Sequence, residues 1–172
     1  MSDTQATTGT TAGTELSPVP NTGRLVEVGD GTYVVGADFG GTCFGCGPAN
    51  RDGLRLRFRL LDDGRVSTTV FVPAHLCGMA GVVHGGVQST ILDEVSGVAA
   101  QTALPTGSST APCVTAELSV RFRRPVSQVG PVTAVARAVR REGHSVHVEA
   151  AIIDADGAEL TTATSRWVQL PA

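Results

Sequence analysis

The segment Gly81-Val82-Val83-His84-Gly85-Gly86 and two acids that follow it form the chain's densest group of potentially reactive residues. Glycines at the start of a helix let a substrate approach the backbone closely. They also leave the first N–H groups unpaired at the positive end of the helix dipole. Such groups can stabilise an oxyanion that develops at a carbonyl. Alternatively, Gly85 and Gly86 only allow close packing, and His84 is a structural cap or loop contact.

The acids, Asp93 and Glu94, stand among residues that are mostly apolar, small or hydroxyl-bearing. On a helical wheel Asp93 shares a face with small residues such as Gly86 and Gly97, whereas Glu94 lies near Ile91 and other apolar residues. Small neighbours leave room for a substrate beside Asp93. A partly desolvated carboxylate has a raised pKa, which suits a general base or nucleophile. The alternative is an acidic pair on a solvated helix face.

A helix over residues 85 to about 103 must position these acids. Its apolar residues recur at spacings of four and three, as expected for one buried face: Val87, Ile91, Val95 and Val98. Gly85 and Asp93 would then lie about 12 Å apart along the helix, at about 1.5 Å per residue. One chain cannot bring both to one carbonyl. If both are catalytic, they must come from different subunits.

Alternating apolar and polar residues predict strands on both sides of this helix. The sequence therefore predicts an α+β fold, in which an antiparallel sheet of five to six strands wraps around one long helix. One helix cannot cover both faces of such a sheet, so we expect pairing with a second copy, as a homodimer or a homotetramer built as a dimer of dimers. The predicted strands cover residues 54–60, 66–72, 114–122, 131–140, 145–154 and 159–169.

Composition limits the possible partners and compartments. The 172 residues are 41% hydrophobic and carry a formal net charge of −3, which argues against binding to nucleic acid or anionic membranes. The sequence has neither a secretory signal nor a run of about 20 apolar residues, so we expect a cytoplasmic protein. Residues 1–22 are mostly small and polar and are predicted to be a disordered tail. Residues 23–172 are predicted to form a single domain.

Cys43-x-x-Cys46 is half of a zinc site or a redox dithiol, but a second such pair is missing. Cys77, Cys113 and His75 could in principle complete four ligands, although nothing in their spacing indicates it. We therefore expect Cys43 and Cys46 to be buried structural thiols. We expect no metal and no cofactor.

Three segments resemble hotdog-fold acyl-CoA thioesterases of the phenylacetate-pathway (PaaI-like) group. Gly81 to Gly86 together with Leu92-Asp93-Glu94 is similar to the helix-start signature of these enzymes. Cys43-Phe44-Gly45-Cys46-Gly47 with Asn50 and Gly53-Leu54 resembles the start of a bacterial branch, and residues 118–125 resemble the strand after the helix. The similarity covers about residues 43–169. It implies the hotdog fold and hydrolysis of an acyl-CoA or acyl-carrier thioester to free acid and thiol.

By this resemblance Asp93 matches the catalytic carboxylate, Gly85 the oxyanion-hole amide and Thr115 the hydroxyl that places the attacking water. His84 matches the motif histidine. Some members carry an amide side chain shortly before the His-Gly-Gly motif, but residues 75–80 contain neither Asn nor Gln, so a second side-chain donor is missing.

Positive side chains could pair with the phosphates of CoA, although ordinary surface charge explains them equally well. The residues that we expect to contact substrate or CoA are Gly86, Glu94, Arg121, Arg123, Arg124 and His144. Two other functions stay open. One is hydration or dehydration of an enoyl thioester with His84 as acid or base, and the other is acyl-thioester binding without catalysis.

Overall fold

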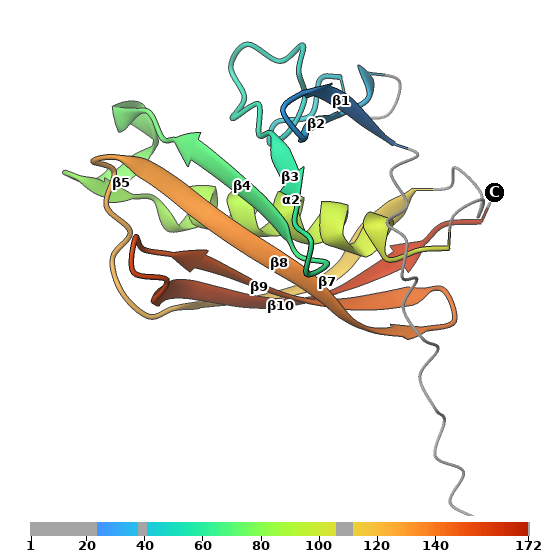
Figure 1. Ribbon diagram of the computed structural model, residues 1–172. Helices are drawn as coiled ribbons and strands as arrows, with labels where there is room; N and C mark the ends of the chain where they lie inside the picture. Colours follow the sequence, from blue (N-terminus) through green and yellow to red (C-terminus); the bar gives the residue numbers. More distant parts are fainter. Residues whose placement is uncertain (1–23, 38–40, 106–111, 172) are drawn as a thin grey trace, which may run out of the picture.

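The computed structural model describes residues 24–37, 41–105 and 112–171, and the predicted tail at 1–22 lies outside them. One long helix, α2 (Gly85–Thr102), runs along the inner side of a curved eight-stranded antiparallel sheet (Figure 1). The sheet contacts this helix through five strands, β4, β7, β8, β9 and β10. The predicted α+β hotdog architecture is therefore confirmed.

The strand order in the sheet is β1-β2-β3-β4-β8-β9-β10-β7. Its strands are β1 (Leu25–Gly29), β2 (Thr32–Val35), β3 (Phe58–Leu60), β4 (Val66–Phe71), β7 (Cys113–Phe122), β8 (Pro131–Glu142), β9 (Ser145–Ile153) and β10 (Glu159–Gln169). A short 3₁₀ helix, η1 (Ala74–Leu76), and a small hairpin of β5 (Cys77–Met79) and β6 (Val82–Val83) precede α2.

The apolar face predicted for the helix is its buried face. Ile91 and Val95 have no exposed surface, and Val87 and Val98 are nearly as deeply buried. They pack into the same core as the inward side chains of the sheet, such as Phe58. None of the helices in the described ranges combines the length and the hydropathy that a membrane span requires.

The predicted strand at residues 54–60 is only partly a strand. Its burial alternates as expected, with Leu54, Leu56 and Phe58 buried between exposed arginines, but ladder pairing begins at Phe58. The backbone N–H groups of Leu54 and Leu56 donate instead to the carbonyls of Phe44 and Gly45. This segment therefore holds the cysteine-containing loop against the domain.

The sheet is larger than expected because residues 25–35 add a hairpin, β1–β2, beside β3. The strands after the helix also do not follow one another in a simple row. β8, β9 and β10 form a meander, whereas β7 pairs with β10 at the edge of the sheet. Most β7 side chains are exposed. Among the described residues, β7 pairs only with β10, so its other side is an exposed sheet edge.

Candidate active site

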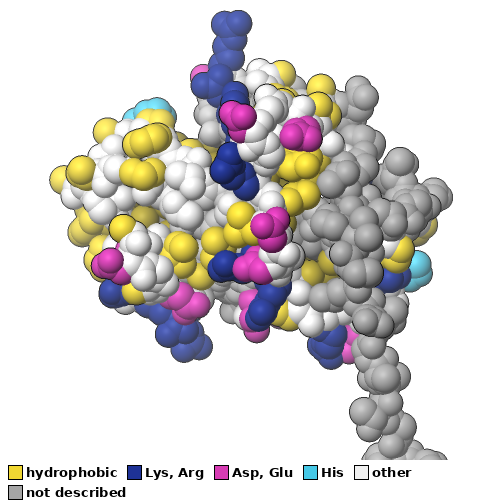
Figure 2. All heavy atoms as spheres, viewed as in Figure 1, with side chains coloured by type: hydrophobic (Ala, Val, Ile, Leu, Met, Phe, Trp, Pro, Cys, Tyr) yellow, Lys and Arg dark blue, Asp and Glu magenta, His cyan; other side chains and the backbone are white. Residues whose placement is uncertain are grey.

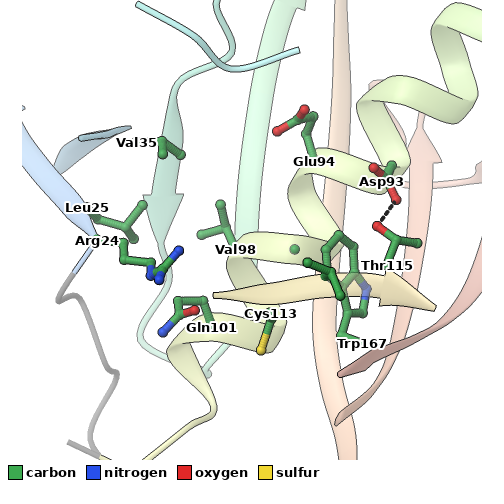
Figure 3. A pocket seen from close by; sticks show the side chains of 12 residues that line it. Arg24, Leu25, Val35, Asp93, Glu94, Val98, Gln101, Cys113, Thr115 and Trp167 are labelled. Carbon is green, nitrogen blue, oxygen red and sulfur yellow. Dashed lines mark hydrogen bonds between the residues drawn. The ribbon is translucent and has the colours of Figure 1, made fainter. Parts of the chain in front are cut away.

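Asp93 lies on α2 and faces Thr115 of β7. The Thr115 hydroxyl donates a hydrogen bond of 2.9 Å to Oδ1 of Asp93 (Figure 3). Burial raises the pKa of Asp93, the Thr115 hydrogen bond lowers it, and the neighbouring charge of Glu94 raises it, with a net increase. A carboxylate with a raised pKa that remains partly accessible is a better proton acceptor than an ordinary aspartate.

Asp93 and Thr115 line a cavity of about 320 Å³. The lining comes from β1, β2, α2, β7 and β10, with Arg24 immediately before β1, and the remaining lining residues are Arg24, Leu25, Val35, Glu94, Gly97, Val98, Gln101, Cys113, Val114 and Trp167. Figure 3 shows Arg24 pointing into the cavity from the side opposite Asp93 and Thr115. The lining is mixed, with apolar walls between a carboxylate end and a guanidinium end.

Gly97 leaves space on the Asp93 side of the helix, and Trp167 occupies it. A Cβ placed on Gly97 would lie 2.8 Å from Cη2 of the indole ring. The indole N–H donates to the Ser165 hydroxyl at 2.9 Å, which fixes the ring against the helix. The small residues predicted to make room for a substrate therefore also admit an aromatic wall.

Because of a bulge in the β7–β10 ladder, the side chains of Thr115 and Phe122 both point toward the helix. Arg166 pairs with Glu117 and Trp167 with Thr115, so one β7 residue is unpaired between them. Without the bulge, Thr115 and Phe122 would point to opposite faces, since seven residues separate them. Instead Thr115 reaches Asp93 and the Phe122 ring lies against the start of the helix, 3.3 Å from where a Cβ on Gly85 would stand.

His84 caps the helix. The His84 Nδ1 accepts a 2.9 Å hydrogen bond from the Gly86 backbone N–H, and the backbone N–H of His84 donates to the Leu76 carbonyl. The Gly86 N–H therefore already has a hydrogen-bond acceptor within the protein. Gly85 is the first residue of α2, so its N–H has no acceptor within the helix. Of the two glycine amides, Gly85 is the better placed to bind an external oxygen.

Glu94 points away from Asp93 toward the cysteine-containing loop, although its side chain also lines the cavity. The Cys43 thiol donates to Oε1 of Glu94 at 3.1 Å. Burial raises the pKa of the neighbouring Cys46 thiol, and the charge of Glu94 raises it further. The structure thus separates the two acids, one beside a hydroxyl and the other beside two thiols.

Comparison with known proteins shows which family this chain is similar to. The model of the thioesterase superfamily matches residues 80–161, which contain Gly85, Asp93 and Thr115. A solved structure of a thioesterase superfamily protein is 30% identical, with a TM-score of 0.65, over 74% of this chain and 60% of that chain. The chain is similar to the thioesterase superfamily over residues 80–161.

Other solved structures share the fold. A phenylacetic acid degradation-related protein from Ralstonia eutropha is 28% identical over 70% of this chain and 89% of that chain, with a TM-score of 0.59. A Bacillus halodurans protein solved with CoA is 24% identical over 69% of this chain and 76% of that chain, also with a TM-score of 0.59. A comparison with curated proteins found no match.

The positive residues predicted to bind CoA do not line the cavity beside Asp93 within one protomer. Arg121 and Arg123 alternate with the helix-facing Phe122, so they lie on the outer face of the sheet, where they line a second hollow. Arg124 pairs with Asp154 at 3.7 Å, and His144 lies in the exposed turn between β8 and β9. On the face seen in Figure 2, positive and negative side chains are interspersed.

Arg24, Leu25, Val35 and Trp167 line the cavity but were not predicted as site residues. They belong to no motif, because they lie far from the helix in the sequence and are brought to the cavity only by folding. The only local signal is the Gly29-Asp30-Gly31 turn, which would have predicted the β1–β2 hairpin.

Proposed function

We propose that this protein is a thioesterase that hydrolyses an acyl-CoA, or a related acyl-carrier thioester, with Asp93 as the catalytic group. The observation that carries the proposal is the Asp93 carboxylate at the cavity wall, held by the Thr115 hydroxyl and with a raised pKa. Thr115 occupies Oδ1, which leaves Oδ2 for a water molecule. No metal or redox cofactor is needed for this step.

In the reaction Asp93 accepts a proton from water as the water oxygen attacks the thioester carbonyl. The tetrahedral intermediate then breaks its carbon–sulfur bond, and the departing thiolate takes the proton from Asp93, which releases free acid and thiol. Direct attack by Asp93 would instead give a mixed anhydride and free thiol, and water would then hydrolyse the anhydride. Incorporation of ¹⁸O from labelled water into Asp93 in a single turnover would identify the anhydride route, because the general-base route puts the label only into the released acid.

The Gly85 amide is proposed to stabilise the oxyanion from the partner subunit. Gly85 and Asp93 lie on one continuous helix, eight residues and therefore about 12 Å apart, so one subunit cannot direct both at one carbonyl. Pairing of two copies along the exposed β7 edge would cover that edge and bring two helices together. We therefore propose an active homodimer, or a dimer of dimers, in the cytoplasm. A fully active monomer at micromolar concentration, measured by light scattering, would contradict this.

CoA is proposed as the carrier because a protein of this fold has been solved with CoA. Gly86, Glu94, Arg121, Arg123, Arg124 and His144 remain the predicted contacts of substrate or CoA. The arginines on the outer face can take part only through the partner subunit or a bent CoA chain. Replacing Arg121 and Arg123 by Ala should raise KM for acyl-CoA and leave KM for the pantetheine thioester of the same acid unchanged.

Thiol release from a panel of short, long and aromatic acyl-CoAs tests the function directly. Thiol release by the full-length protein and its loss in Asp93→Asn support the proposal. Addition of water to an enoyl-CoA without thiol release would make the protein a hydratase. Saturable binding of acyl-CoA with neither reaction would make it a binding protein. The use of His84 Nδ1 as the helix cap disfavours the hydratase, because that nitrogen is not available as a base.

A further inference from the structure

A second cluster of reactive side chains lies next to the proposed catalytic pair, where the cysteine-containing loop meets α2. The sulfur atoms of Cys43 and Cys46 and a carboxylate oxygen of Glu94 all lie within 4.8 Å of one another. Cys46 is buried, and the other two side chains are partly buried. Among the described residues these three are the group that brings together atoms able to hold a metal ion.

The backbone of the loop is shaped around these atoms. The Gly47 N–H donates to the Cys43 carbonyl at 3.0 Å, which folds residues 43–47 into a tight turn with both thiols on one side. A Cβ on Gly47 would lie 2.4 Å from the Cys43 nitrogen, so this turn requires glycine. A Cβ on Gly45 would lie 2.3 Å from Oε1 of Glu94. Glycine at this position therefore lets the loop approach the carboxylate.

The loop is also held in place from the other side. Backbone hydrogen bonds of 3.0 Å join Leu54 to Phe44 and Leu56 to Gly45. Leu54 and Leu56 are themselves buried in the core. The two thiols are therefore presented to Glu94 by a rigid support, which lowers the cost of ordering ligands around an ion.

The geometry points to a site for a thiophilic divalent cation, most simply zinc, with Cys43, Cys46 and Glu94 as its protein ligands. Two thiolates favour zinc over magnesium or calcium, which prefer oxygen ligands. Zinc is usually four-coordinate, so three protein ligands leave one position for water. The missing half of the Cys-x-x-Cys site is thus a carboxylate from the helix rather than Cys77, Cys113 or His75.

Such an ion would connect the loop to α2 directly beside Asp93. It would fix Glu94 away from the reacting carbonyl and replace the thiol–carboxylate hydrogen bond. Its role would be to position the loop and the helix, and the hydrolysis proposed for Asp93 does not depend on it. The metal site and the proposed function can therefore fail independently.

Cobalt(II) provides the test, because it occupies zinc sites and gives a near-ultraviolet charge-transfer band only when thiolates bind it. The full-length protein is reduced, stripped with a chelator and titrated with Co²⁺ without oxygen. We expect a thiolate–cobalt band that saturates at one equivalent per chain and disappears on addition of Zn²⁺. Elemental analysis of the zinc-treated protein after gel filtration should give the same stoichiometry.

Single variants assign the ligands. Cys43→Ser and Cys46→Ser should each weaken or abolish the band, and Glu94→Gln should weaken Zn²⁺ binding by about tenfold or more. Cys77 is a half-buried cysteine outside the cluster, so Cys77→Ser is the matched control and should retain the full band. Zn²⁺ should raise the Tm of the unaltered protein and of Cys77→Ser, but raise that of Cys43→Ser much less.

The unaltered protein alone can overturn the inference, so the test does not require every variant to fold. Absence of a thiolate–cobalt band in the reduced protein would show that the cluster is held by hydrogen bonds only. A band that survives in both Cys43→Ser and Cys46→Ser would place the ion elsewhere. A Cys43–Cys46 disulfide in the isolated protein, with no Co²⁺ binding after reduction, would make the pair a dithiol instead.

Discussion

Replacing Asp93 by Asn tests the proposed chemistry with the least disturbance of the structure. The Asn side chain has nearly the same volume, and its Oδ1 can still accept the 2.9 Å hydrogen bond from Thr115. What disappears is the ability to take a proton from water. Loss of a general base typically slows a reaction by about 10²–10⁴-fold, or about 3–5 kcal/mol in the barrier at about 1.36 kcal/mol per tenfold.

The loss should appear in kcat rather than in KM, since the cavity keeps its shape. Release of CoA is followed with a thiol reagent at saturating substrate, and Glu94→Gln, the neighbouring acid, is the matched variant that should cost far less. Stability gives a second check. The raised pKa of Asp93 means that its ionised form disfavours folding above the pKa of the unfolded chain. Asn removes that charge, so the free energy of unfolding at pH 7 should not fall.

A kcat loss of less than about tenfold in a folded Asp93→Asn dimer would refute the assignment. An inactive Glu94→Gln together with a fully active Asp93→Asn would move the catalytic role to the other acid. A large loss of stability in Asp93→Asn would show that the carboxylate is mainly structural.

Three further predictions concern pH, the core and the tail. With a raised pKa, Asp93 becomes protonated at a higher pH than an ordinary aspartate, so kcat/KM should fall with acidification already at that higher pH. Thr115→Val removes a hydrogen bond that lowers this pKa, and the fall should move to still higher pH; an unchanged profile would contradict the coupling. Phe58 has no exposed surface, so Phe58→Ala should lower the free energy of unfolding, measured in urea, by about 3–5 kcal/mol. A loss below about 1 kcal/mol would place Phe58 outside the core. A chain without residues 1–22 should keep its kcat and Tm, and loss of turnover at unchanged Tm would reveal a functional element in the tail.

Local periodicity predicted the central helix and most of the strands, because burial on one face leaves a repeat in the sequence. The β1–β2 hairpin was missed because Val26 and Val28 are about half exposed, at 53% and 49%, so their alternation does not mark a core face. The position of β7 beside β10 also lay beyond local patterns. Which strands pair across the sheet depends on contacts between residues some 40 positions apart, such as Thr161 with Phe122.

Within the candidate site the sequence was informative about single residues and poor about contacts. The wheel placed Asp93 beside small residues, and the resemblance added Thr115, which the structure brings to within hydrogen-bonding distance. The wheel placed Glu94 near apolar residues and gave it no partner. Its partner, Cys43, is 51 residues away in a loop whose path is set by Leu54 and Leu56, and neither spacing nor periodicity encodes that contact.

The position of β7 at the sheet edge sets the order in which the site can be assembled during synthesis. β7 pairs with β10, which is translated after β8 and β9, so the strand that carries Thr115 has no place in this sheet until β10 has been synthesised. Domains form from the N-terminus as the chain emerges, but here the helix with Asp93 is finished some 65 residues before Trp167, the residue that pairs with Thr115. The cavity wall is therefore closed only after Trp167 has been synthesised, and a nascent chain that ends before β10 carries the acid without a β10 strand to hold the hydroxyl beside it.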